Sequence, residues 1–269
     1  MSDPLMLKAA LHAHSTYSDG EFTLPEIKRI FSEQGCSVVC MTDHADSFDQ
    51  PKLADYVREC AELSDEQFSF ISGLEYSCEQ RMHILGYGVT VLADTIDPQK
   101  IIQHIEQHGG LAVIAHPKDT MFSWIETFEV LPLGIETWNS KYDGQYAPRP
   151  ATFELLLRLR QRRPGMRAFY GQDLHWKKQF RGLFTQLECD AHTREAVLGA
   201  LSAGIYYGVK DDLQLPSSGE LPPELSIRFA ARHANSDRMR NFLKAGKNAI
   251  DRLGIRVPAS IKAQLRRIF

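Results

Sequence analysis

The chain has 269 residues, of which 43% are hydrophobic and 24% are charged, and its formal net charge is −3. These values are ordinary for a globular protein, and the length suits one large α/β domain or a domain with a small appendage. No apolar run approaches the roughly 18 residues that a membrane span needs, which argues against an integral membrane protein.

Five cysteines occur without a Cys-x-x-Cys pair. An odd number without that spacing favours reduced thiols rather than a disulfide framework. The first residues also lack the basic region and apolar core of a secretory signal. We therefore expect a cytoplasmic protein with buried, reduced cysteines.

Short apolar runs alternate with helical patterns through most of the sequence. The two runs Val38–Met41 and Leu111–Ala115 are almost continuously apolar, as in strands that are buried on both faces. Strand and helix alternation of this kind predicts a parallel sheet, either open or closed into a barrel. The runs expected to be β-strands are Leu7–His14, Ser37–Asp43, Phe68–Glu75, His83–Val89, Leu111–His116, Gly134–Trp138, Arg167–Asp173 and Gly204–Val209, with Gly182–Cys189 as an additional strand.

Four helices are expected between these strands. A capping box that begins at Thr23 opens the first helix, and Asp97, followed by proline, caps the second. The other two are expected over Ala151–Arg163 and Thr193–Ala203.

The charge is distributed unevenly along the chain. From Ser226 onward, eleven basic residues face only two acidic ones, so this part carries +9 and the remainder carries −12. The stretch Gln214–Pro223, rich in proline, serine and glycine, is typical of a linker. We therefore expect a domain over residues 1–213, a linker over 214–223 and a basic helical C-terminal extension over 224–269. Within that extension, an amphipathic helix is expected from Ser236 to Gly254, followed by a short final helix, and the extension either docks on the acidic domain or contacts nucleic acid.

Imidazole and carboxylate side chains gather at the ends of the expected strands. Successive residues of a strand alternate between its faces, so His12 with His14, and Asp173 with His175, should point the same way. Such clusters of imidazole and carboxylate groups are what a multinuclear metal site requires. Asp43 is left out because it fits a turn or capping residue. The candidate metal ligands are His12, His14, Asp19, His44, Glu75, His83, His116, Asp173 and His175.

The order and spacing of these residues resemble a known family. The motifs His12-x-His14-x4-Asp19-Gly20, Thr42-Asp43-His44, Gly73-Leu74-Glu75, Ala115-His116-Pro117 and Asp173-x-His175 are similar to those of the PHP superfamily, named for polymerase and histidinol phosphatase. The resemblance covers roughly residues 7 to 210. It implies a distorted (β/α)7 barrel, and because eight runs exceed seven barrel strands, at least one run should be peripheral. One departure is Gln172, where a smaller residue is more usual.

The resemblance also implies a trinuclear centre. It assigns one divalent metal ion to His12, His14, Glu75 and Asp173, a second to Glu75, His83 and His116, with Glu75 bridging, and a third to Asp19, His44 and His175. Zinc, manganese and iron all suit imidazole and carboxylate ligands, so the identity of the three ions stays open.

The ligand set fits phosphoester hydrolysis. In this hypothesis a hydroxide that bridges the metal ions attacks phosphorus in line, and the ions neutralise the developing charge. Glu75, Asp173 and His175 are the residues we expect to be catalytic. The cationic residues after the site strands are candidates for binding phosphate; Arg181 and Lys141 are favoured, and Lys177 is a further candidate. His104 and His108 have helical spacing but no third ligand, and are expected to face solvent.

Several functions remain open. The leading hypothesis is a phosphoric ester hydrolase acting on a small phosphorylated metabolite, and the alternative is a nucleotidase or 5'-3' exonuclease on short oligonucleotides. A protein-tyrosine phosphatase is a further possibility within the enzymes. A regulatory PHP domain without catalysis is the alternative of a different class. The substrate, the leaving group and the oligomeric state stay open.

Overall fold

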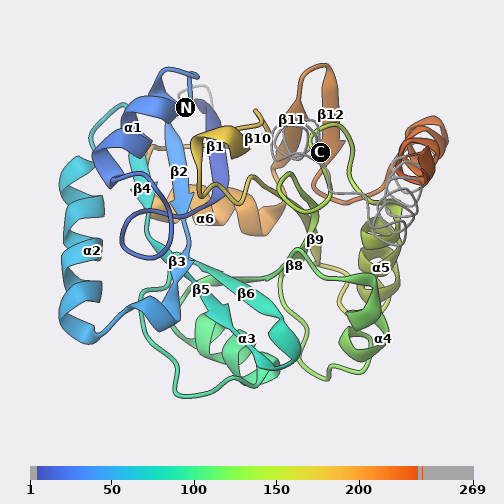
Figure 1. The fold of residues 1–269 in the computed structure, drawn as a ribbon, viewed down its shortest axis with the longest axis horizontal. Helices are drawn as coiled ribbons and strands as arrows, with labels where there is room; N and C mark the ends of the chain where they lie inside the picture. Colours follow the sequence, from blue (N-terminus) through green and yellow to red (C-terminus); the bar gives the residue numbers. More distant parts are fainter. Residues whose placement is uncertain (1–4, 236–237, 239–269) are drawn as a thin grey trace, which may run out of the picture. The chain divides into compact units, whose positions relative to one another are not determined.

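The computed structural model describes residues 5–235 and 238, and the chain divides into one compact unit that ends at Pro223 and a second that begins at Glu224 (Figure 1). The first unit contains both sheets and all the candidate ligands. In the second unit residues 224–235 are helical, whereas the amphipathic helix expected from Ser236 and the short final helix lie outside the described residues apart from residue 238.

One sheet of the first unit places the N-terminal strand between parallel and antiparallel neighbours. Its order is β12-β11-β10-β1-β2-β4. β1 pairs parallel with β2 and antiparallel with β10. The bounds are β1 Leu5–Ala13, β2 Val38–Met41, β4 Ser69–Ile71, β10 Phe184–Cys189, β11 Tyr206–Lys210 and β12 Leu213–Pro216.

The second sheet has the order β3-β5-β6-β7-β8-β9. Strand β6 runs antiparallel to both of its neighbours, whereas the other pairs in this sheet are parallel. The bounds are β3 Asp43–His44, β5 Gly73–Ser77, β6 His83–Tyr87, β7 Leu111–Ala115, β8 Gly134–Asn139 and β9 Arg167–Gly171.

The two sheets meet where β1 ends. A parallel bridge joins Ala13 to Leu174, which follows β9. The expected α/β class with parallel strands is therefore observed as a mixed α/β fold with two sheets. Closure of these strands into a (β/α)7 barrel stays a prediction.

Helices cover the sheets, and local sequence explains where they start. In α1, Leu24–Ser32, the Thr23 capping box is present, and Leu24, Ile27 and Phe31 are buried. In α3, Pro98–Gln107, Asp97 accepts hydrogen bonds from the first-turn amides. The remaining helices are α2 Gln50–Leu63, α4 Phe122–Ile125, α5 Pro150–Arg160 and α6 Arg194–Ala203.

Figure 1 shows α1 and α2 beside β2 and β4, α3 next to β6, and α5 next to β8. The four helices expected from the sequence correspond to α1, α3, α5 and α6, but α2 and the short α4 were not anticipated. The signals for α2 are an Asp49 cap, whose side chain accepts from the Lys52 amide, and a proline in the first turn. None of the described helices is both long and apolar enough to cross a membrane.

Three expected segments differ from the structure. The run Phe68–Glu75 contains β4 and the start of β5, and the run Ser37–Asp43 contains β2 and the start of β3. In both cases the two strands belong to different sheets. Gln214–Pro216, expected within a linker, belongs to β12, because its backbone pairs with β11 and Leu215 is fully buried. Proline and glycine content alone did not distinguish a short edge strand from a connection. The five cysteines are free and buried.

Candidate metal centre

The candidate ligands come from the ends of strands in both sheets. His12 lies near the end of β1, Glu75 lies in β5, and His116 follows β7 directly. His83 starts β6, and because β6 is antiparallel to its neighbours, its first residue lies beside Ser77 and Ala115 at the ends of theirs. The chain reversal at β6 therefore brings a strand-start histidine to the edge where the other strands end.

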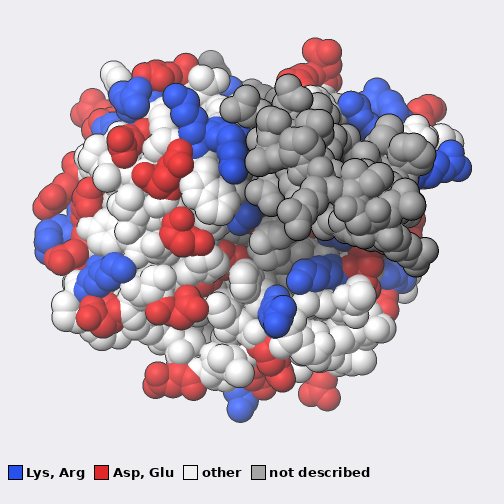
Figure 2. All heavy atoms as spheres, viewed as in Figure 1, with Lys and Arg blue, Asp and Glu red and all other residues white. Residues whose placement is uncertain are grey.

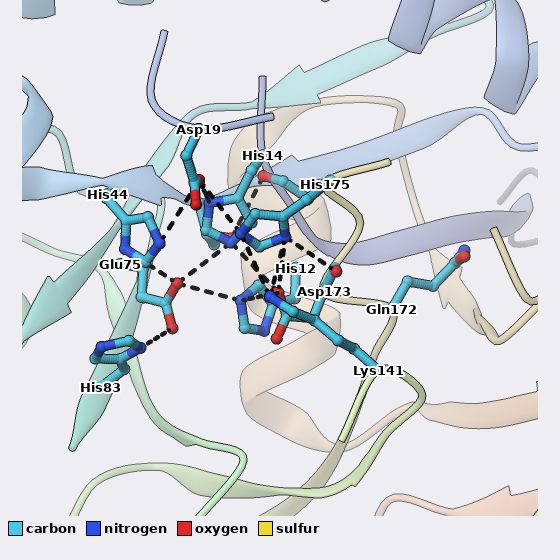
Figure 3. Close-up of polar contacts among 12 residues, drawn as sticks. His12, His14, Asp19, His44, Glu75, His83, Lys141, Gln172, Asp173 and His175 are labelled. Atoms are coloured by element: carbon cyan, nitrogen blue, oxygen red, sulfur yellow. Dashed lines mark hydrogen bonds and ion pairs between the residues drawn. The ribbon is translucent and has the colours of Figure 1, made fainter. Parts of the chain in front are cut away.

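Among the described residues, four groups of side chains could each hold a metal ion, with ligand atoms within 4.8 Å of one another. Together these groups contain all nine candidate ligands, and Figure 3 shows most of them converging on one centre. The groups are His14, Asp19, His44 and His175; His12, Glu75 and His116; His12, His14 and Asp173; and His44, Glu75 and His83.

Glu75 occupies the middle of this cluster. Its Oε2 atom lies 3.4 Å from His12 Nε2 and 3.2 Å from His14 Nε2. Its Oε1 atom lies 2.8 Å from His83 Nδ1 and 3.2 Å from His116 Nε2. One carboxylate thus faces imidazoles on both sides, which is the position required of a ligand shared by two ions.

Asp19 approaches from the loop after β1. Its Oδ1 atom lies 3.2 Å from His175 Nε2 and 3.7 Å from both His14 Nδ1 and His44 Nε2. Asp19 is about half exposed (53%), in contrast to the buried carboxylates of Glu75 and Asp173. This group therefore lies at the solvent side of the cluster.

Burial and charge act together on the protonation of the cluster. Burial alone would raise the pKa of Glu75 and Asp173, but the surrounding histidines, His12 foremost, hold both pKa values well below the usual range. Burial alone would likewise lower the pKa of His12, yet Glu136, Asp173 and Glu75 keep it well above the usual value. Burial, aided by neighbouring histidines, lowers the pKa of His14 to about 3, so this candidate ligand is neutral.

Within the cluster, three buried imidazole nitrogens have no hydrogen-bond partner among the described residues. They are His12 Nε2, His14 Nδ1 and His14 Nε2. Buried polar atoms are normally satisfied, so imidazole nitrogens that lie beside two carboxylates without forming hydrogen bonds need a partner that protein atoms do not supply. A divalent cation coordinated by imidazole and carboxylate is such a partner, and the residues present fit it.

The backbone adopts uncommon conformations at three of the candidate ligands. His12, His116 and Asp173 have positive φ angles of 61°, 28° and 53°. Such conformations cost of order 1–3 kcal/mol each in non-glycine residues and persist where surrounding structure holds them. At His12 the pairing between β1 and β2 also shifts register. His12 and His14 therefore lie in the same cluster, as expected. The end of β1 is irregular at His12, however, so the alternation of side chains along a regular strand does not explain why both face the cluster.

A buried carboxylate outside the expected set supports the cluster. The Glu136 side chain of β8 accepts a hydrogen bond from His12 Nδ1 (2.8 Å), from the His116 amide (3.0 Å) and from Asn139 Nδ2 (3.0 Å). Asn139 also donates to Asp173 at 3.2 Å. Sequence reasoning missed Glu136. A glutamate within the apolar run Gly134–Trp138 indicates a buried carboxylate, and a buried carboxylate needs partners such as histidines.

Asp43 supports the loop that carries Asp19. It accepts hydrogen bonds from the amides of Ser15 and Ser18 and from both of their hydroxyls, at 2.6–3.1 Å. This matches its interpretation as a turn residue outside the ligand set.

The expected phosphate-binding cations occupy different places. Lys141 points into the cluster, with its Nζ atom 3.0 Å from Asp173 Oδ1 and next to the His175 ring (Figure 3). Arg181 donates to the backbone carbonyl of Ser140. Lys177 lines a separate open cleft together with Glu21, Trp176 and Lys178. Their roles toward a substrate stay predictions.

Two further expectations concern residues beside the site. Gln172 is buried, and Figure 3 shows its amide directed away from the cluster. His104 on α3 and His108, which follows it, belong to none of the four groups, and each ring contacts a backbone carbonyl. His108 is exposed as expected, whereas His104 is only partly exposed.

The mixed α/β fold and the imidazoles and carboxylates gathered at its strand ends are those of a candidate metalloprotein. The sequence model of the PHP domain family matches residues 10–167, which is more than half of the chain. The chain belongs to the PHP domain family. No curated protein sequence matches it.

Solved structures share this fold at low sequence identity. One is a two-domain protein containing a predicted PHP-like metal-dependent phosphoesterase from Bacteroides vulgatus ATCC 8482, with a TM-score of 0.55 and 14% identity, covering 79% of this chain and 67% of that chain. Another is PsfC from Pseudomonas syringae PB-5123, with a TM-score of 0.54 and 13% identity, covering 86% of this chain and 98% of that chain. At these identities the similarity shows a common fold.

Proposed function

We propose that this chain is a metal-dependent hydrolase that cleaves phosphoesters of a small phosphorylated metabolite at a trinuclear site. The observation that carries the proposal is the convergence of nine imidazole and carboxylate side chains, with three orphaned imidazole nitrogens among them. Membership of the PHP domain family and the fold shared with a predicted phosphoesterase support it.

The proposed ligand sets are those that the family resemblance implies, and the contacts are compatible with them. His12, His14, Glu75 and Asp173 would hold one ion, and Glu75, His83 and His116 a second. The third would be held by Asp19, His44 and His175, whose ligand atoms lie together with His14 in one group. Glu75 would serve two ions, since its two oxygens face different imidazoles.

Bound divalent ions would supply a nucleophilic hydroxide near neutral pH and neutralise charge on the phosphoryl oxygens. The chain itself would fix the geometry through Glu75, Asp173 and His175, the residues that we propose as catalytic. The ammonium of Lys141 would hold a phosphate oxygen, because it already lies between Asp173 and His175 at the centre. Burial of Glu75 and Asp173 would strengthen these interactions by excluding water.

The test is metal-dependent phosphate release. Metal-reconstituted protein would be offered sugar phosphates, histidinol phosphate, nucleotides, phosphotyrosine peptide and short oligonucleotides. Glu75→Ala and His116→Ala should lose bound metal and activity together, whereas His104→Ala, an imidazole outside the four groups, should keep both. Full activity of either ligand variant would show that the assigned site is wrong.

A nucleotidase or 5'-3' exonuclease is a second proposal, motivated by the eleven basic residues after Ser226. On the face that Figure 2 displays, acidic and basic side chains are interspersed over the described residues, so that part of the surface favours a small substrate. Salt separates the two proposals, because KM for a polyanion rises steeply with salt whereas KM for a small substrate changes less. A flat salt response on the preferred substrate would exclude the exonuclease.

A further inference from the structure

A cleft of about 300 Å³ opens beside the candidate metal centre. His83 and His116 line it, and both also face Glu75 in the ligand cluster. The cleft is therefore continuous with the side of the centre that these two imidazoles form. Its lining is completed by Arg81, Met82, Ala115, Lys118, Met121 and Tyr142.

Two cations of this cleft are without partners. Within the described part of the chain, the exposed side chains of Arg81 and Lys118 form no hydrogen bond or ion pair. Other basic residues near the centre are engaged: Arg149 with Asp119 and Asp143, and Lys141 with Asp173. Arg81 and Lys118 thus offer positive charge that no protein carboxylate neutralises.

Both cations come from segments that also carry a ligand. Arg81 precedes His83 by two residues, and Gln80 and Arg81 have positive φ angles of 55° and 59°. Such a pair of strained residues is held only when surrounding structure fixes the turn. Lys118 follows His116 by two residues. The segments that position the imidazoles therefore position the cations as well.

The rest of the lining is apolar or aromatic. The walls come from Met82, Met121 and Tyr142, and none of the described residues that line the cleft is acidic. The Tyr142 ring lies 4.5 Å from the His116 ring and is about half exposed. Apolar walls around cations raise the local potential and leave room for the carbon skeleton of a ligand.

We propose that this cleft binds a second anionic group of the substrate, held by Arg81 and Lys118, while the scissile phosphate lies at the metal centre. The substrate class is then a small molecule with two anionic groups, such as a bisphosphate or a phosphorylated acid, joined by a short carbon skeleton. This inference rests on the proposed function for the position of the reacting phosphate.

Binding of phosphonates tests the cleft without turnover, because their carbon–phosphorus bond resists phosphoester hydrolysis. Titration calorimetry on the metal-loaded protein would compare butylphosphonate with propane-1,3-, butane-1,4- and hexane-1,6-bisphosphonate. We expect at least one bisphosphonate to bind about tenfold or more tightly than butylphosphonate, as charge-assisted hydrogen bonds allow. Equal affinity for all four compounds would overturn the inference.

Variants locate the second anion. Arg81→Met and Lys118→Met should each reduce the preference for the bisphosphonate at least threefold and leave butylphosphonate binding unchanged. Lys100→Met, which removes an exposed cation from α3, should retain the full preference. Circular dichroism and metal content would establish that each variant is folded, and either cleft variant suffices if the other does not fold. Full preference in both cleft variants would place the second anion elsewhere.

The outcome separates this inference from the proposed function. If the wild type prefers the bisphosphonate through Arg81 and Lys118 but releases no phosphate from any phosphoester, the cleft is retained and the hydrolase is rejected. If it hydrolyses single-anion and two-anion esters with equal kcat/KM and shows no bisphosphonate preference, the hydrolase is retained and the cleft is rejected.

Discussion

The Nδ1 atom of His12 donates to the buried carboxylate of Glu136 at 2.8 Å. A carboxylate can only accept, so this bond places the proton on Nδ1 and leaves Nε2 to face Glu75 and Asp173. Glu136 also accepts a hydrogen bond from the His116 amide and another from Asn139, whose side chain donates to Asp173 as well. One residue of β8 therefore orients three candidate ligands, although it belongs to none of the four groups that could hold a metal ion.

Replacing Glu136 should weaken metal binding. In Glu136→Gln only one position remains an acceptor, so at least one of the three donors would face an amide NH2 group. We expect the affinity for divalent metal to fall about 10–100-fold, the range found for residues that orient metal ligands. Competition with a chromophoric chelator measures this, and Glu154→Gln, an exposed glutamate of α5, is the matched control. Unchanged affinity in Glu136→Gln would remove its positioning role.

Gly171→Ala should act through the same contact. A Cβ atom at this position would lie 1.7 Å from Glu136 Oε1 and 3.0 Å from His12 Cβ. The carboxylate must move away, which breaks its bond to His12, so metal affinity should fall as it does in Glu136→Gln.

The double variant Gly171→Ala/Glu136→Gln provides the stringent comparison. Two changes that remove one interaction are not additive, so the double variant should lose little more affinity than the worse single variant. Gly199→Ala is the control, because a Cβ there meets nothing within 4 Å and its helical site should gain up to about 1 kcal/mol of stability. Fully additive losses would mean that Gly171 and Glu136 act separately.

Metal binding should release protons below neutral pH. Glu136 and its neighbours hold the pKa of His12 above the ordinary value, and Glu75 raises the pKa of His83, although burial opposes both shifts. Metal ions need neutral imidazoles, so binding must displace these protons, and apparent affinity should rise with pH until both histidines are neutral. Glu75 and Asp173, whose pKa values are lowered, should release none.

Calorimetry in two buffers of different ionisation enthalpy measures the number of protons released. At pH 6 the observed enthalpy should depend on the buffer, and the dependence should shrink as the pH rises. An enthalpy independent of the buffer at pH 6 would show that the histidines are already neutral.

Asp43→Asn should destabilise the metal-free protein. The carboxylate accepts four hydrogen bonds from Ser15 and Ser18, and an amide group would turn its NH2 toward donors. We expect the free energy of unfolding to fall by about 1–3 kcal/mol, the cost of leaving buried polar groups unsatisfied. Denaturant unfolding with chelator present measures it, with the exposed Asp94→Asn as control. If Asp43→Asn lowered the free energy of unfolding no more than Asp94→Asn does, the loop would not depend on Asp43.

Sequence by itself determined which residues form the candidate metal centre. Strand-end histidines and carboxylates identified all nine residues that the structure gathers, because short apolar runs and metal-ligand residue types are local features. Capping residues such as Thr23 and Asp97 likewise predicted helix starts from a few neighbouring positions.

Tertiary structure decided what depends on distant pairing. The antiparallel course of β6 brings His83 to the centre, β8 places Glu136 against His12, and backbone pairing turns Gln214–Pro216 into a strand. Arg81 and Lys118, 37 positions apart, share one cleft only because β6 and β7 lie side by side. Residue type and spacing report the local preference of a segment, whereas the partner of a strand is fixed by burial and hydrogen bonding across the whole fold.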